Sequence, residues 1–316
     1  MRTRAYPLFV SILVIAALGL GLSGCSKSPS TATVQKPSVY DLGVGLFGPN
    51  QSGTGAAALR FSIQPGATFA ANYVTDAQTG GKKLQIIALD NGKQIDFKLN
   101  GAAGATHTIV ALTGPHTFPI VFGPLSGGLH NIVVIAIADP DNHRLDAEWR
   151  AATESYTYPT KVISLSVGSA SLAEKPAGAA VGESVPDSDF GNVALSPTDK
   201  MELAAWPTRN VKPGETIGCF IHLGNPSSAA IPYALCILLD GRQISLAKGA
   251  LTAVSGSLVA GQRLILPVQI TAPDKPGTYE LMAVAGINPF VQQPKTTSDK
   301  NTAFYFGSAR TALVVE

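Results

Sequence analysis

The two halves of this chain repeat each other at a nearly constant spacing, and this repeat limits the folds that the chain can adopt. Gln64–Phe69 (QPGATF) matches Lys212–Ile217 (KPGETI), an offset of 148 residues from 64 to 212. Four further matches follow in the same order at similar offsets: Leu89–Ile95 with Leu239–Ile244 after one deletion, Phe118–Ile120 with Leu266–Val268, Gly128 with Gly277, and Tyr158 with Phe306. Ordered matches of this kind indicate a duplicated unit, so the sequence predicts two copies of one domain.

Hydrophobicity alternates with a period of two residues inside each unit. Apolar residues occupy every second position of 163–167 and of 217–223, which is typical of a strand with one buried face. Asp90–Gly92 and Asp240–Gly241 stand between apolar runs and favour tight hairpin turns. The strands expected in the first unit lie near 57–63, 68–75, 84–90, 93–98, 107–112, 117–122, 130–138 and 158–167, with counterparts in the second. The sequence therefore predicts an all-β fold of two tandem antiparallel immunoglobulin-like β-sandwiches.

Composition agrees with a turn-rich β protein and disfavours nucleic-acid binding. Only 14% of the residues are charged and 45% are hydrophobic, with 32 Gly and 22 Pro, which argues against a helix-rich or disordered chain. The net charge of +2 comes from Arg2 and Arg4, because the first 24 residues contain no acid. A balanced chain lacks the electrostatic field that collects nucleic acid, so we expect no nucleic acid among its partners.

Residues 1–24 have the features of a secretory signal peptide. After Arg2 and Arg4, the segment Leu8–Leu20 is apolar except for Ser11, and it is shorter than the roughly 20 residues that span a bilayer. The segment ends in Leu22-Ser23-Gly24-Cys25, which resembles the lipobox of bacterial lipoproteins. The resemblance implies cleavage after Gly24, a diacylglycerol thioether on Cys25 and usually a further acyl chain such as palmitate. We expect an extracytoplasmic protein anchored by this lipid to a bacterial membrane, and the alternative is an ordinary signal peptide followed by a chance cysteine.

The sequence divides into five segments. The signal peptide, 1–24, precedes a Ser/Thr/Pro/Lys-rich stretch over 25–40 that we expect to be a flexible tether. The two sandwiches are expected over 41–167 and 197–316, separated by a polar linker over 168–196. Each sandwich has enough chain to bury its own core, so we expect each to fold alone.

The second unit is similar to immunoglobulin-like modules of the CARDB type, which occur in bacterial surface proteins. Three features carry the resemblance: the turn Pro213-Gly214-Glu215, the turn Asn225–Ser228 after an alternating strand, and the hairpin Leu239-Asp240-Gly241. In the first unit Ala67 replaces the glutamate of this pattern, and no Asn-Pro turn follows. The resemblance implies a module that binds, spaces or presents, and it names no ligand.

Cys219 and Cys236 are the remaining cysteines. They fall on successive expected strands, which belong to opposite sheets of an immunoglobulin-like sandwich, and export would place them in an oxidising space. We therefore predict a disulfide, and two separate buried thiols are the alternative. Two cysteines without CxxC spacing make a poor zinc site, so we expect no metal centre and no cofactor.

Acidic residues after the strand near 130–138 form one candidate site. Asp139, Asp141, Asp146 and Glu148 could supply oxygen ligands to calcium, although they lack the spacing of an EF-hand. The alternative is a short helix over 142–153, capped by Asp141 or Asn142, with Leu145 and Trp149 facing the sandwich.

Motifs for catalysis are nearly absent. Gly43–Gly48 matches G-x-G-x-x-G, but Pro49–Ser52 follows where a dinucleotide site needs a helix, so we interpret it as a glycine-rich start of the first unit. The histidines occur singly, and each is expected to be structural: His107, His116, His130, His143 and His222. The aromatic residues near the last strand of each unit are expected in the core rather than on a binding surface: Tyr156, Tyr158, Phe304, Tyr305 and Phe306.

Two function classes remain. The first is a non-catalytic binding, adhesion or spacing module of the cell envelope, whose partner is an envelope protein or a glycan. The second is an envelope hydrolase that acts on cell wall or polysaccharide with dispersed catalytic residues. The duplication and the absence of motifs favour the first, since an enzyme would usually place a catalytic constellation in one copy.

Overall fold

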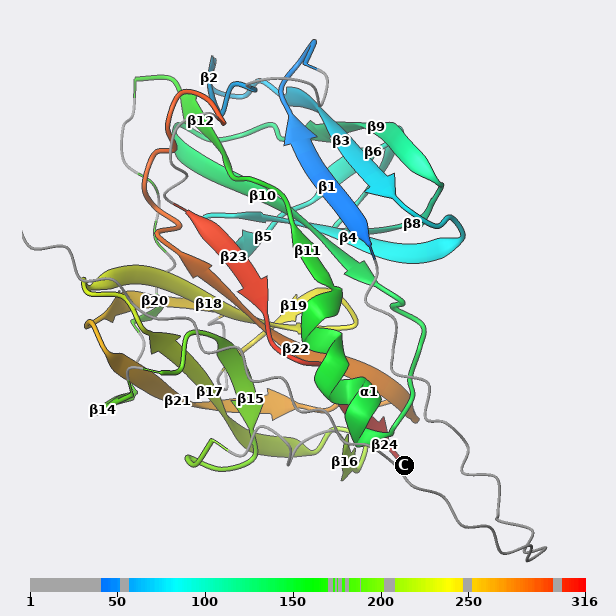
Figure 1. Ribbon diagram of the computed structural model, residues 1–316, viewed down its shortest axis with the longest axis vertical. Helices are drawn as coiled ribbons and strands as arrows, with labels where there is room; N and C mark the ends of the chain where they lie inside the picture. The colour runs from blue at the N-terminus through cyan, green and yellow to red at the C-terminus, as the bar shows by residue number, and fades with distance from the viewer. Residues whose placement is uncertain are drawn as a thin grey trace, which may run out of the picture. The chain divides into compact units, whose positions relative to one another are not determined.

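Both halves of the chain fold into antiparallel β-sandwiches, as the alternation predicts (Figure 1). The computed structural model describes residues 41–316 apart from 52–56, 170–172, 174, 176–177, 180–181, 188, 202–207, 247–251 and 298–302. Cys25 and the expected signal peptide and tether lie outside the described residues.

The first sandwich contains β1 to β12. One sheet has the order β1 (Leu42–Phe47), β3 (Phe69–Ala77), β9 (Gly114–Phe122), β6 (Phe97–Leu99) and β7 (Ala102–Gly104). The other has the order β2 (Arg60–Ile63), β12 (Ile163–Val167), β10 (Gly128–Ala138), β4 (Lys82–Asp90) and β5 (Lys93–Gln94), with β8 (Thr106–Ala111) also on β4 and β11 (Thr157–Pro159) on β10. These are the two sheets of an immunoglobulin-like fold, with strands in A-B-E-D and G-F-C order.

The second sandwich repeats this arrangement with β13 to β24. One sheet has the order β14 (Glu183–Pro186), β21 (Gln262–Thr271), β17 (Thr216–Asn225) and β15 (Val193–Ser196). The other has the order β13 (Gly178–Ala179), β20 (Ala253–Leu258), β18 (Ile231–Leu239), β22 (Gly277–Ile287), β24 (Thr311–Val315) and β16 (Thr208–Val211), with β19 (Arg242–Ile244) on β18 and β23 (Phe304–Gly307) on β22.

Strand registers confirm the duplication. Phe69 faces Phe122 in the first sandwich and Ile217 faces Ile270 in the second, so both members of the pair shift by 148 residues. Likewise β2 runs parallel to β12 with Ile63 beside Val167, and β16 runs parallel to β24 with Val211 beside Val315. Tyr158 and Phe306 also occupy equivalent places, on β11 and β23. The two halves therefore share the topology of their central strands, and they differ at one sheet edge, where β14 lies beside β21 and β6 lies beside β9.

Two sequence interpretations need correction. The sequence match of Leu89–Ile95 with Leu239–Ile244 assumed that the second hairpin lacks one residue, and this is wrong. Asp90 pairs with Lys93 and Leu239 pairs with Arg242, so each hairpin has a two-residue turn. The linker expected over 168–196 is wrong in part, because β13, β14 and β15 all pair with strands of the second sandwich. β14 is a short, mostly exposed edge strand, where polar side chains are compatible with pairing, whereas β15 is a buried and mainly apolar strand.

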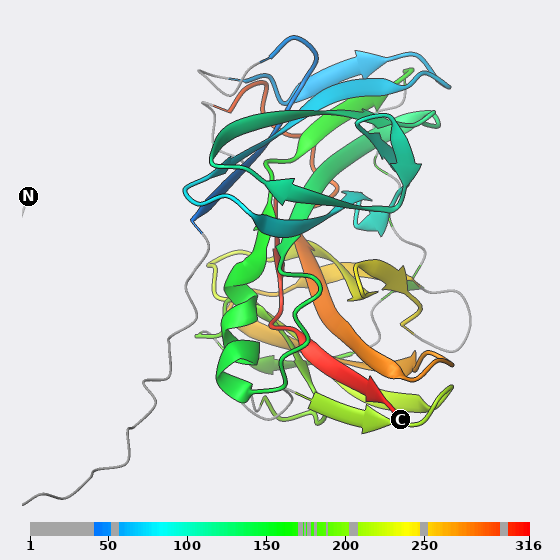
Figure 2. The same ribbon diagram turned by 90° about the vertical axis from the view of Figure 1, so that its right-hand side faces the viewer.

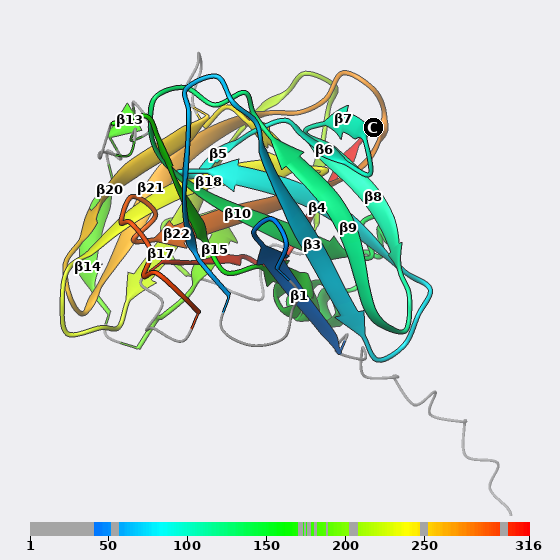
Figure 3. The same cartoon turned by 90° about the horizontal axis from the view of Figure 1, so that it is seen from above.

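The two sandwiches pack through a third buried cluster, in addition to their own cores. It joins side chains of β4 and β10, among them Leu89 and Ile135, to side chains of β18 and β22, among them Leu238 and Val284. Figure 3, seen from above, shows β4 and β10 overlying β18 and β22. The sandwiches therefore share a buried apolar cluster between the sheets that contain these strands.

A segment of each sandwich extends over the other. We call residues 139–157 the first arm and residues 288–297 the second arm. The first arm contains helix α1 (Ala147–Ala152) and the 3-10 helix η1 (Thr153–Tyr156), and Figure 2 shows α1 lying beside the strands of the second sandwich. In the second arm, the backbone of Lys295 accepts a hydrogen bond from Leu59 N at 2.9 Å.

Candidate functional site

Helix α1 fixes the first arm against the second sandwich. Its N-cap is Asp146, whose Oδ1 accepts a hydrogen bond from Trp149 N at 2.9 Å. The helix therefore begins later than the cap at Asp141 or Asn142 that the sequence suggested, and Leu145, which precedes it, is 50% exposed rather than buried. Trp149 is buried and packs edge-on against Tyr156 with ring centroids 6.2 Å apart. The interpretation as a capped helix is thus right in kind, with a different start.

Two buried arginines flank this tryptophan. The guanidinium carbons of Arg150 and Arg310 each lie 5.0 Å from the Trp149 ring centroid, one from the first arm and one from the segment before β24. Arg310 Nη1 also donates to the backbone oxygen of Asp139 at 3.0 Å. Cation–π contact of this kind compensates part of the cost of burying a guanidinium.

Glu280 on β22 neutralises part of this positive charge. Its Oε2 accepts a hydrogen bond from Arg150 Nη1, and its Oε1 lies 2.9 Å from His143 Nδ1. The side chains of Arg150 and Glu280 are 2% and 7% exposed. An ion pair this deeply buried costs desolvation, and removing either partner leaves an uncompensated charge in a low-dielectric interior.

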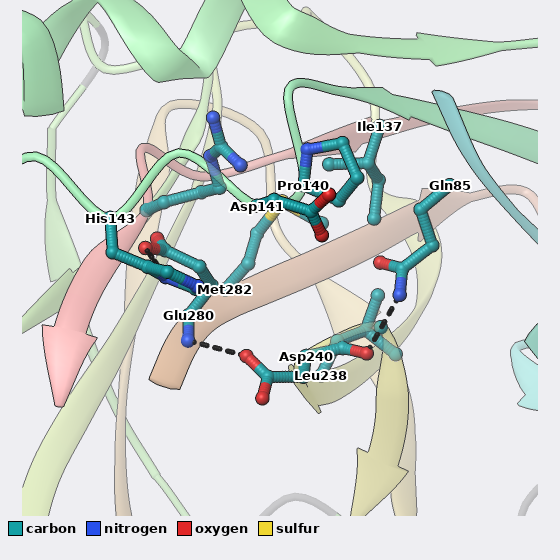
Figure 4. A pocket seen from close by; sticks show the side chains of 11 residues that line it. Gln85, Ile137, Pro140, Asp141, His143, Leu238, Asp240, Glu280 and Met282 are labelled. Atoms are coloured by element: carbon teal, nitrogen blue, oxygen red, sulfur yellow. Dashed lines mark hydrogen bonds and ion pairs between the residues drawn. The ribbon is translucent and has the colours of Figure 1, made fainter. Parts of the chain in front are cut away.

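A cavity of about 160 Å³ lies beside this ion pair, between the two sandwiches (Figure 4). Its lining residues come from both sandwiches and from the first arm: Gln85, Ile137, Pro140, Asp141, His143, Leu238, Asp240, Gly241, Glu280, Met282 and Arg310. Gln85 Nε2 donates to the backbone oxygen of Asp240 at 2.9 Å, and Asp240 Oδ1 accepts from Glu280 N at 2.7 Å. Lys83 and Asp141 form an exposed ion pair of 2.6 Å at the same side.

Burial shifts the pKa values of three ionisable groups around this cavity. Desolvation raises the pKa of Asp139, an effect that the nearby Arg310 opposes. Desolvation also raises the pKa of Asp240, against the hydrogen bond from the Glu280 backbone. It lowers the pKa of Arg310, while Glu280 favours the charged guanidinium. Since arginine starts from a very high pKa, Arg310 stays charged at neutral pH.

The charged groups break the symmetry between the two copies. Strand registers place Asn131 where the second sandwich has Glu280, because Asn131 faces Ser164 and Glu280 faces Ala312. By the same offsets, Asn91 corresponds to Asp240 and Val162 to Arg310. Three charged residues on one side of the interface therefore have neutral counterparts on the other. These charges therefore distinguish the second sandwich from the first at the interface.

Both carboxylate oxygens of Glu280 are already engaged, and no serine, threonine or cysteine lines the cavity. In the described part of the chain, no three His, Cys, Asp or Glu side chains group to hold a metal ion.

The disulfide prediction is wrong: Cys219 and Cys236 are free and buried. Cys219 belongs to the core of the second sandwich, whereas Cys236 belongs to the cluster between the sandwiches. Cys219 points from β17 into that core, whereas Cys236 points from β18 toward the first sandwich, so the sheet that contains β18 lies between the two thiols. Burial raises the pKa of each thiol to about 12.

The calcium candidates do not converge. Asp141 pairs with Lys83, Asp146 caps α1, and Glu148 is exposed in the first turn of that helix. The backbone oxygen of Asp139 accepts a hydrogen bond from Arg310. Each of these four acidic residues therefore lies in a different local environment.

The remaining candidates from the sequence are the glycine-rich run, four histidines and the aromatic residues near the last strands. Residues 43–47 of the glycine-rich run lie in β1, and a turn follows at 49–50. His107, His116 and His222 contact backbone oxygens, and His130 Nδ1 lies 2.6 Å from Asp90 Oδ2. Among the aromatic residues, Tyr156 and Tyr305 are buried, Tyr158 and Phe306 are half-buried, and Phe304 is 53% exposed.

Sequence reasoning missed Arg150, Glu280 and Arg310. Arg150 and Glu280 are 130 positions apart, and Arg310 and Asp139 are 171 positions apart, so no local motif could group them. Aligning the repeat and asking where charge replaces a neutral residue would have found Glu280.

No family model matches the chain, and no curated protein matches it. Solved structures match it with low scores. A red sea bream transglutaminase is 11% identical over 88% of this chain and 31% of its own, with a TM-score of 0.23. The C-terminal domain of the antigen I/II-family protein AspA of Streptococcus pyogenes is 8% identical over 88% of this chain and 100% of its own, with a TM-score of 0.24. No helix among the residues that the structure describes is long and apolar enough to span a membrane.

Proposed function

We propose that this protein is a lipid-anchored component of the bacterial cell envelope that works as a non-catalytic binding, adhesion or spacing module. The observation that carries the proposal is the buried cluster between the two sandwiches, which joins β4 and β10 to β18 and β22. Two sandwiches held by an apolar buried interface act as one rigid block, in contrast to domains joined by a flexible linker. A rigid block suits a protein that presents a surface at a fixed geometry.

The anchor part of the proposal rests on the lipobox-like sequence Leu22-Ser23-Gly24-Cys25. Fifteen residues separate Cys25 from the first described residue, Asp41, and the Ser/Thr/Pro-rich composition of this stretch suits a tether. Lipid on Cys25 would therefore leave the sandwiches free to meet a partner near the membrane.

Lipid labelling tests the anchor. We expect the wild-type chain to incorporate an alkyne-tagged fatty acid and the Cys25→Ala variant to remain an unlabelled precursor, because Cys25 supplies the thioether. Cys219→Ala is the matched control and should be labelled normally, since that thiol is buried in the second sandwich. A Cys25→Ala protein that is mature and still bound to the membrane would remove the lipoprotein assignment.

An exposed aromatic pair is the best surface for a glycan or protein partner. Phe304 on β23 is 53% exposed and stacks on Phe306 with ring centroids 5.8 Å apart and planes inclined by 24°. Aromatic faces of this kind stack on sugar rings or anchor a protein interface.

Binding to purified envelope glycan tests this surface. Phe304→Ser should weaken binding at least about tenfold, whereas Val259→Ser, at an apolar position that is 56% exposed, should leave it unchanged. Equal binding by both variants would exclude the aromatic pair as the contact surface.

A further inference from the structure

We infer that the two sandwiches contact each other as the two subunits of a twofold-symmetric dimer would, within a single chain. The ion pair between Arg150 and Glu280 makes this interface specific for an unlike pair, which is one first sandwich with one second sandwich. The partner that fits the face of β4 and β10 is thus a second copy of the same domain. The inference concerns how the two copies recognise each other and does not depend on the proposed function.

Reciprocal hydrogen bonds show the self-complementarity. Gln94 N donates to Gln243 Oε1 at 2.5 Å, and Gln243 N donates to Gln94 Oε1 at 2.6 Å. These residues hold equivalent places in β5 and β19, opposite Leu89 and Leu238. A contact in which residue i binds its own counterpart in both directions is the mark of twofold symmetry.

The buried cluster obeys the same symmetry. Leu89, which faces Gln94, and Leu238, which faces Gln243, are both members. Ile135 and Val284 are also both members, and they occupy equivalent places on β10 and β22. The interface is therefore made of one face used twice.

The arms are exchanged in the same way. Asn131 Nδ2 donates to the backbone oxygens of Pro289 and Val291 in the second arm, at 2.9 and 3.2 Å. Its counterpart Glu280 binds Arg150 and His143 of the first arm. Equivalent positions thus receive opposite arms, one through neutral hydrogen bonds and the other through charge.

This difference discriminates between pairings. A pair of two first sandwiches would place each buried Arg150 over Asn131, and a pair of two second sandwiches would leave each Glu280 without its arginine. Two first sandwiches bury Arg150 without a carboxylate partner, and two second sandwiches leave Glu280 with Arg310 but without Arg150, so each like pair loses the buried ion pair, which is unfavourable. Only the unlike pair gives both Arg150 and Glu280 their ion-pair partner. The ion pair therefore stabilises the unlike pair and disfavours the like pairs.

Cleavage of the full chain tests the inference. A protease site inserted at 170–172, between β12 and β13, separates the halves covalently after the protein has folded. Native mass spectrometry in detergent then resolves unlike pairs, the two kinds of like pair and single halves by mass. For the cleaved wild type we expect unlike pairs to predominate.

The variant Arg150→Gln/Glu280→Gln removes both charges and therefore the penalty on like pairs. We expect like pairs to rise at least roughly tenfold relative to unlike pairs, given the cost of a buried unpaired charge. Lys83→Gln is the matched control, since Lys83 is 57% exposed, pairs with Asp141 of its own half and should leave the distribution unchanged.

A second variant keeps the test decisive if the glutamine variant fails to fold. In the charge-swapped chain, Arg150→Glu/Glu280→Arg, the ion pair forms with its charges reversed. After cleavage, its first half should pair with its own second half and not with the second half of the wild type. Wild-type halves that separate freely would overturn the shared interface. Free mixing of swapped and wild-type halves, or like pairs as abundant in the wild type as in the glutamine variant, would overturn the role of the ion pair.

Discussion

Asn91 and Asp240 occupy equivalent first positions of two hairpin turns, and each side chain binds the neighbouring strand in the same way. Asn91 Oδ1 accepts a hydrogen bond from Asn131 N at 3.1 Å, and Asp240 Oδ1 accepts one from Glu280 N at 2.7 Å. Both residues have positive φ, 51° and 48°, as do the glycines that follow them. The turns are therefore two-residue turns of the type that suits strand twist, and each presses against the opposite sandwich.

Gly92→Ala tests the close approach at the first of these turns. A Cβ at Gly92, where φ is 84°, would lie 2.6 Å from Ala234 Cβ in the second sandwich. We expect a loss of about 2–4 kcal/mol in the free energy of unfolding, from backbone strain and overpacking together.

Gly101→Ala is the matched control for this change. Gly101 follows Asn100 in an equivalent turn with φ of 85°, and nothing lies within 4 Å of its added Cβ. Its cost should be only about 1 kcal/mol, from backbone strain alone. Equal losses in urea unfolding would show that the two sandwiches do not meet at Gly92.

Trp149→Ala tests the anchoring of the first arm. Trp149 is buried, contacts Tyr156 and lies beneath both arginines, so its removal leaves a cavity and unsupported guanidinium groups. We expect a loss of about 3–5 kcal/mol in urea unfolding. Leu145→Ala, at a position 50% exposed, should change stability by less than about 0.5 kcal/mol. A small effect of Trp149→Ala would mean that the arm is not held by this contact.

The fold was more accessible to sequence reasoning than the site. Period-two alternation and the Gly-containing turns reflect local chemistry, so they predicted the strands of both sandwiches and their repeat. The hairpin at Asp90 shows the limit: matching it to Asp240 by identity required a deletion, whereas backbone conformation equates Asn91 with Asp240. Glu280 and Arg150 meet only because the first arm crosses to the other sandwich, and no sequence period records that crossing.

The buried thiols predict a specific chemical inertness. Burial raises the pKa of Cys219 and Cys236 from 9.0 to about 12, and only the thiolate reacts readily. At pH 8 we expect iodoacetamide to leave both thiols unmodified in the native protein and to alkylate both in urea. A reductant should leave the thermal midpoint unchanged, because there is no bridge to break. Rapid native alkylation, or a midpoint that falls with reductant, would contradict the free buried state.

The same shifts give these thiols a pH-dependent contribution to stability. Because the folded pKa of each thiol exceeds its unfolded value, the folded state holds the proton more tightly. The contribution is fully present below about pH 9 and is lost as the pH rises from there through 12. Cys219→Ala/Cys236→Ala should therefore show a shallower loss of stability between pH 9 and 11 in urea titrations. Equal slopes for the two proteins would show that the thiols do not titrate differently on unfolding.

The shared interface predicts that the two sandwiches unfold together, in contrast to the separate folding expected from chain length alone. Leu89 is fully buried and belongs to the cluster between the sandwiches rather than to either core. Leu89→Ala should cost about 2–5 kcal/mol, so amide exchange through global unfolding should accelerate at least roughly 30-fold. The acceleration should be the same in β9 of the first sandwich and in β21 of the second, because opening the interface removes buried apolar area from both. Val110→Ala, at a position 47% exposed, should change neither strand. Acceleration confined to β9 would mean that the sandwiches are independent folding units, and the rigid block on which the proposed function depends would be lost.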